Sequence, residues 1–145
     1  GAWLWTRTLV GTGSGIAMAL TSDAAGNLFV AGGATVASFD AGGATRWVRP
    51  FLSPQATAGT ASGVVLDELG PLIVSGSYFA TNGQQSQVLT AAYGLAGRAL
   101  AVSEHGGPRG DYAAPHGVAA GPRGALYVVG NLPNSHDTDG LLLRY

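Results

Sequence analysis

The chain has 145 residues, a length that fits one ordinary domain with its own core. Its net charge is -1 and only 10% of its residues are charged, which argues against a surface that binds a nucleic-acid backbone. No apolar run reaches the roughly 20 residues that span a bilayer, and with Cys at zero there are neither disulfides nor thiolate metal sites, so we expect a soluble chain.

The 24 glycines and the hydrophobic content of 46% favour an all-β chain of short strands and tight turns. In chain order, apolar alternation predicts six strands, Ile16–Thr21, Leu28–Ala31, Val64–Leu66, Leu72–Ser75, Val118–Ala120 and Leu126–Val129. These strands form three pairs, each with a glycine in its turn, as in DAAGNLFVAG. We expect the turn glycines Gly26, Gly70 and Gly124 to adopt conformations that an L-residue adopts only at a cost.

Each pair belongs to a longer unit that repeats along the chain. A third strand that ends in an aromatic residue follows each pair, and in the first two units a Gly-rich turn and a fourth strand come next. The third unit has no fourth strand after Tyr145. If about three turn residues are imagined there and the sequence resumes at its start, Gly1 aligns with Gly43. In the same alignment Trp5-Thr6-Arg7 falls on Trp47-Val48-Arg49, so the N-terminal segment has the sequence of the missing strand.

Three four-stranded units, the last closed by the N-terminal strand, predict a β-propeller, which leaves no exposed sheet edge. The expected single unit covers 1–145, with 1–9 as the closing strand and 16–51, 63–105 and 117–145 as the three blades. Closed propellers use roughly 4 to 8 blades, so three would form an open arc with apolar end faces. Two copies that exchange their first strands would give six blades and a homodimer. A fragment of a longer propeller explains the same pattern, and a β-trefoil, which also has three repeats, is the rival fold.

The stretch DAAGNLFVAG followed by FDAGGATRWVRP resembles the bacterial β-propeller repeats known as SBBP, and more loosely the Trp-bearing repeats of quinoprotein-type propellers. The resemblance covers nearly the whole chain and implies a fold rather than a function, because turn glycines and packing aromatics are structural. It departs from the pattern at Pro71, which replaces the usual Asn, and at Ala101, which replaces Trp. No quinone-ligand set is present, so we expect no cofactor. A secreted or cell-surface bacterial protein is the favoured location.

In propellers, the loops between the second and third strands and those between blades lie on one face. These loops are short in the first unit and long in the other two, where they cover 77–87, 103–116 and 131–139. The ligand-binding cluster predicted there consists of His105, Arg109, Asp111, His116, His136, Asp137 and Asp139. Polar residues also fill ordinary surface loops. No metal is assigned, because the histidine spacings match no familiar zinc pattern and Asp137-Thr138-Asp139-Gly140 lacks the later Glu of a calcium loop.

The predicted function is a non-catalytic binding or scaffolding module that presents the loops of blades two and three to a glycan or protein partner. No nucleophile turn or carboxylate pair indicates catalysis. The alternative is a propeller hydrolase or lyase with a loop-bound metal at the channel mouth. The residues assigned to assembly are Trp3, Trp5, Leu141, Leu143 and Tyr145. Because Trp5 and Trp47 recur at one repeat position, we expect both to pack between blades.

Overall fold

The computed structural model describes residues 4–8, 16–51, 56–68, 70–80, 86–106, 113–133 and 137–145. These residues form eleven β-strands and one short 3₁₀-helix, Pro122–Gly124, so the all-β prediction is confirmed. Within this part of the chain, no helix is long and apolar enough to span a lipid bilayer.

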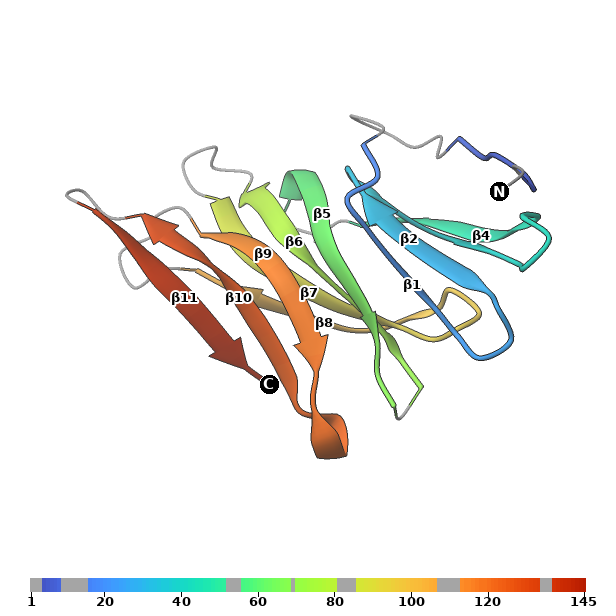
Figure 1. Ribbon diagram of the computed structural model, residues 1–145. Helices are drawn as coiled ribbons and strands as arrows, with labels where there is room; N and C mark the ends of the chain where they lie inside the picture. The colour runs from blue at the N-terminus through green and yellow to red at the C-terminus, as the bar shows by residue number, and fades with distance from the viewer. Residues whose placement is uncertain are drawn as a thin grey trace.

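The strands form three antiparallel sheets, and each sheet follows the order of the chain (Figure 1). Sheet one consists of β1 (Ala19–Ser22), β2 (Leu28–Gly32), β3 (Thr35–Phe39) and β4 (Thr45–Pro50). Sheet two consists of β5 (Ala56–Leu66), β6 (Leu72–Ala80), β7 (Ser86–Tyr93) and β8 (Ala99–His105). Sheet three consists of β9 (Ala114–Ala120), β10 (Leu126–Pro133) and β11 (Thr138–Arg144). The three repeat units therefore correspond to three sheets.

All six predicted strands are present, but the one predicted over Ile16–Thr21 begins only at Ala19, as β1, and four others extend several residues beyond their predicted bounds. β5 begins at Ala56 and β9 at Ala114, while β6 continues to Ala80 and β10 to Pro133. The stretch before Val64 consists of small and polar residues, and bulges interrupt its pairing with β6, so it lacks the period-two apolar pattern of a strand. The boundaries expected at 63 and 117 consequently fall inside β5 and β9.

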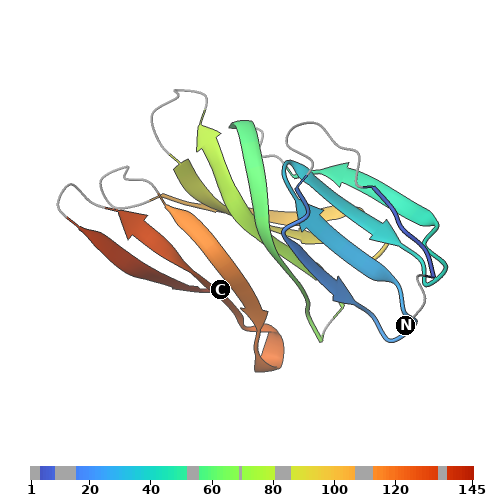
Figure 2. The same cartoon turned by 45° about the horizontal axis from the view of Figure 1, so that its top comes forward.

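Sheet two lies between the other two sheets, and side chains on both of its faces belong to hydrophobic cores (Figures 1 and 2). Successive side chains of a strand point to opposite faces. In β7, Leu89 and Ala91 belong to the core shared with sheet one, whereas Val88 belongs to the core shared with sheet three. The described strands thus form three stacked sheets. A β-trefoil would require a closed barrel, which these strands do not form.

The first strands of the three sheets lie side by side, because β5 contacts β1 on one side and β9 on the other. Small residues line these contacts. Gly33 forms an isolated bridge with Ala61, and the Ser62 hydroxyl donates to the Pro115 carbonyl at 2.8 Å. A Cβ atom added to Gly63 would lie 3.0 Å from a methyl carbon of Val118. The three sheets therefore approach most closely along their first strands.

The outer faces of the stack are apolar and exposed. On sheet one, Met18 and Leu20 are 55% and 69% exposed. On sheet three, Val129 and Leu142 are 49% and 67% exposed, and they lie directly opposite each other in register. Each end of the stack therefore presents exposed apolar side chains.

The turns between the first and second strands of each sheet lie at the opposite end from the long loops. Gly26, Gly70 and Gly124 have φ angles of 79°, 110° and 77°, which confirms their predicted conformation. In the first turn, Asp23 accepts hydrogen bonds from the backbone and side chain of Asn27, and the side-chain bond holds the pKa of Asp23 below its usual value. Pro71 stands where Asn27 stands and has no amide hydrogen, so it cannot make the equivalent bond.

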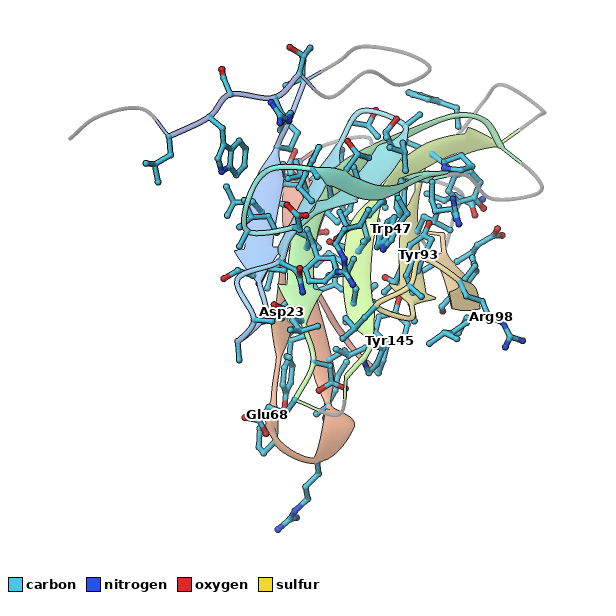
Figure 3. The ribbon with its side chains drawn as sticks, turned by 90° about the vertical axis from the view of Figure 1, so that its right-hand side faces the viewer. Asp23, Trp47, Glu68, Tyr93, Arg98 and Tyr145 are labelled. Atoms are coloured by element: carbon cyan, nitrogen blue, oxygen red, sulfur yellow. The ribbon has the colours of Figure 1, made fainter. Side chains whose placement is uncertain are left out.

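Trp47 joins sheet one to sheet two (Figure 3). Its ring centroid lies 6.2 Å from that of Phe29 and 6.4 Å from that of Tyr93. Its Nε1 atom donates to the Leu95 carbonyl at 2.9 Å. The indole lies against Gly97, where a Cβ atom would come within 2.7 Å of the ring. Because Gly97 also has a φ of 82°, its turn needs glycine for both conformation and space.

The residues after Trp47 strengthen the same junction. Arg49 Nε donates to the Gly97 carbonyl at 2.9 Å, and the Tyr93 hydroxyl donates to the Pro50 carbonyl at 3.2 Å. The prediction that Trp47 packs between units is therefore confirmed.

We expect the Gly97→Ala substitution to destabilise the protein more than Gly26→Ala. The two glycines have φ angles of 82° and 79°, so both variants lose about 1 kcal/mol to the left-handed conformation. Only the methyl group at Gly97 meets the indole, and overpacking adds about 1 to 3 kcal/mol. At Gly26 the nearest atom is the Ala41 Cβ at 3.3 Å. Urea unfolding followed by circular dichroism measures both losses, and equal losses would contradict the seating of Trp47 on the turn.

Candidate functional site

The ends of the strands that border the long loops of sheets two and three lie together at one end of the molecule. The registers pair Val88 with His105 in sheet two and Pro133 with Thr138 in sheet three. The two sheets are joined here, because the Ala113 amide donates to the Ser86 carbonyl at 2.9 Å and the Ser86 hydroxyl donates back to the Ala113 carbonyl. We call this region the loop end.

Four residues of the predicted cluster fall within the described residues. His105 is half-buried at the end of β8, and His116 is exposed in β9. Asp137 and Asp139 are exposed at the start of β11. Arg109, Asp111 and His136 lie outside the described residues.

The strand registers place His105 and Asp139 on facing surfaces of two neighbouring sheets. His105 is paired with Val88, which belongs to the core shared with sheet three. Asp139 is paired with Leu132, which packs against the same core from sheet three. Paired residues of an antiparallel ladder project on the same side of the sheet. The two side chains therefore flank the junction between sheets two and three.

Neither metal nor proton-transfer chemistry is indicated by the described residues. Among them, no group of three His, Cys, Asp or Glu side chains is arranged to hold a metal ion. The pKa shifts of Asp23, Tyr78 and Tyr93 all lead away from neutral pH, downward for the aspartate and upward for the tyrosines. General acid-base catalysis needs a pKa close to the working pH, so these three groups are unsuited to it.

A polar cluster around the buried Tyr78, which the sequence analysis did not identify, lies below the loop end of sheet two. Tyr78 is 1% exposed, and its hydroxyl donates to Gln87 Oε1 at 2.8 Å. Burial, followed by a hydrogen bond with Glu104 and the charge of that carboxylate, raises the pKa of Tyr78 to about 12. The hydroxyl has one hydrogen to donate, so Gln87 and Glu104 are alternative acceptors. The sequence predicts a loop over 77–87. In the structure β6 and β7 extend into this range, and the pairing of β6, β7 and β8 aligns the three side chains.

The N-terminal segment 4–8 repeats on sheet one the contacts that β4 makes with sheet two. Trp5 Nε1 donates to the Ala41 carbonyl at 3.3 Å, and Arg7 Nε donates to the Gly43 carbonyl at 2.6 Å. A Cβ atom on Gly43 would come within 2.7 Å of the Trp5 ring. Ala41 and Gly43 occupy the repeat positions of the two residues that accept from Trp47 and Arg49. The alignment of Trp5-Thr6-Arg7 with Trp47-Val48-Arg49 is thus reproduced in three dimensions.

The other residues assigned to assembly lie at the far end of the arc. Leu141 and Leu143 pack against the core between sheets two and three, and the Thr90 hydroxyl donates to the Tyr145 hydroxyl at 3.4 Å. Trp3 lies outside the described residues. Sheet three has three strands, and segment 4–8 lies on sheet one at the opposite end of the arc (Figure 2). Within one chain, the N-terminal segment therefore does not complete sheet three.

We expect stability to fall between about pH 10 and about pH 12 because of Tyr78. A pKa raised from 10.0 to about 12 stabilises the folded protein below pH 10, and this contribution is lost as the pH rises through 12. The shift corresponds to about 3 kcal/mol. Melting temperatures across this range should depend less on pH in a Tyr78→Phe variant. A Gln87→Leu variant keeps the titrating group and should keep the dependence, whereas an unchanged pH dependence in Tyr78→Phe would exclude Tyr78 as its source.

No family model matches the chain, and no curated protein matches it. The resemblance to SBBP repeats therefore stays a prediction that depends on the turn glycines and the Trp-x-Arg strands. Function has to be inferred from the geometry of the chain's own residues.

Proposed function

We propose that the chain is a non-catalytic β-propeller module that binds a glycan or protein partner at its loop end. Sheets one, two and three are its blades. Two observations support the propeller. The sheets are antiparallel meanders stacked face to face, and their first strands β1, β5 and β9 lie side by side, as the inner strands of propeller blades do.

The difference in strand length between the sheets supports the loop end as the binding surface. In the repeat, Gly32 corresponds to Gly76; β2 ends at Gly32, whereas β6 continues past Gly76 to Ala80. At about 3.3 Å per residue, the four extra residues raise the loop end of sheet two by roughly 13 Å above that of sheet one. Sheet one therefore forms a low step beside a raised edge.

The residues on this raised edge have the chemistry that glycan and peptide ligands need. His105 and Asp139 supply hydrogen-bonding groups at the junction of sheets two and three. Phe79, which is 42% exposed at the end of β6, supplies an aromatic surface. Phe79 lies opposite Ser86 in the pairing of β6 with β7, and Ser86 forms the hydrogen bond to Ala113 that joins sheets two and three. Phe79 therefore faces the junction between these two sheets. An aromatic ring beside polar groups is a common platform for the face of a sugar or an apolar side chain. This juxtaposition is the observation that carries the proposal.

A broad glycan array, followed by calorimetry on any hit, tests the proposed function. We expect His105→Ala and Asp139→Asn each to weaken binding about tenfold or more, with little change in melting temperature. Arg98→Ala is the matched control, because Arg98 is an exposed residue in the turn between β7 and β8 at the opposite end.

The same experiment separates the competing outcomes. If neither His105→Ala nor Asp139→Asn changes the affinity, the binding site lies elsewhere on the molecule. If no glycan binds, capture of a protein ligand through the same two residues would decide for the protein partner, and insensitivity there would overturn the proposal. A stoichiometric metal in the purified protein, with melting that is sensitive to chelator, would instead favour the hydrolase or lyase.

A further inference from the structure

Segment 4–8 has the side-chain contacts of an outer strand without a strand to pair with. In β4, the same contacts are made by residues whose backbone pairs with β3, as Ser38 does with Trp47 and Val36 with Arg49. The described residues of the N-terminal segment belong to no sheet. Trp5 and Arg7 nevertheless hold this segment on sheet one in the position of β4 on sheet two.

Sheet three offers the complementary strand edge. β11 is the last strand of its sheet among the described residues, and it occupies the repeat position of β3. The pairing of Val128 with Leu143 corresponds to that of Val30 with Ala37. It follows that Arg144, at the end of β11, corresponds to Ser38, the partner of Trp47.

These correspondences fix a register. Trp5 would lie opposite Arg144, Thr6 opposite Leu143, and Arg7 opposite Leu142 in an antiparallel pair. We propose that residues 4–8 of one copy of this chain form the fourth strand of sheet three in a second copy.

The apolar end faces support a second copy as the occupant. On sheet three, the exposed Val129 and Leu142 correspond to Ala31 and Val36, which are fully buried between sheets one and two. On sheet one, Leu20 is 69% exposed, whereas its counterpart Val64 in sheet two is 9% exposed. Each exposed apolar position thus corresponds to one that the chain buries at its own internal junction. Sheet three of one copy therefore fits sheet one of another as sheet one fits sheet two.

A pocket at the edge of β11 can accommodate the indole of Trp5 from the second copy. It has a volume of about 440 Å³ and is lined by residues that include Tyr127, Arg144 and Tyr145. In the repeat, Tyr127 corresponds to Phe29, whose ring lies 6.2 Å from that of Trp47. A fourth strand in the inferred register directs Trp5 toward Tyr127 in the same way. The pocket is thus completed by a side chain from the other copy.

Two copies related by a two-fold axis make this contact twice and leave neither end face open. The resulting ring has six sheets, which lies within the range of roughly 4 to 8 found in closed propellers. A single copy cannot satisfy its own edge, because its N-terminal segment and β11 lie at opposite ends of the arc (Figure 1).

Light scattering on the unmodified chain gives the first test. The expected mass is that of a dimer, twice the 14.5 kDa of one chain. Trp5→Ala should weaken dimerisation about tenfold or more, whereas Leu4→Ala should have little effect because Leu4 is 91% exposed. A well-folded monomer at all accessible concentrations would overturn the proposal, and would point to another part of a longer polypeptide as the occupant of β11.

Cysteine cross-linking tests the register, and the chain has no native Cys to interfere. A variant with Arg7→Cys and Leu142→Cys should form a covalent dimer on oxidation, with a peptide that links residues 7 and 142. A variant with Leu4→Cys and Leu142→Cys places the thiols three residues out of register and should remain uncross-linked. A dimer that cross-links equally in both variants, or only in the second, would refute the proposed pairing.

Discussion

The seating of an indole on a glycine turn is the contact on which the arrangement of sheets one and two depends. Apolar burial of Trp47 against Phe29 and Tyr93 attracts the sheets but has no preferred direction. Hydrogen bonds to the carbonyls of Leu95 and Gly97 add direction, so they fix how high and at what angle one sheet meets the next. Trp5 and Arg7 make the same pair of bonds with the corresponding turn of sheet one, so the contact occurs at two of the three repeat positions, and Ala101 stands at the third.

The two ends of the sheets differ in their structural role, because the indoles of Trp5 and Trp47 contact the glycine turns at one end. The turns that receive the indoles need glycine, close approach and satisfied carbonyls, so their sequences are constrained by the fold. At the loop end, the described strands of sheets two and three are longer than those of sheet one and carry His, Asp and aromatic residues. Scaffold proteins commonly carry binding residues on the loops that connect their rigid elements.

The sequence predicts the strands that alternate between apolar and small residues, and the turns marked by glycine, because both signals are local. It does not predict the first half of β5, since small residues and bulges remove the period of two. The cluster of Tyr78, Gln87 and Glu104 was missed for a related reason: its members meet only through the pairing of three strands. The facing positions of His105 and Asp139 likewise depend on which neighbour each sheet packs against, which no local pattern encodes.

The small residues along β5 have a geometric consequence. Ala61 is fully buried at the bridge to Gly33, and Gly63 leaves no room for a methyl group beside Val118. Bulky aromatic residues, by contrast, separate the sheets at their outer edges, where Trp47 lies between Phe29 and Tyr93. The junction between sheets one and two is therefore narrow along the first strands and wider where Trp47 packs. The difference in side-chain size between the two sides sets the angle at which sheet one meets sheet two.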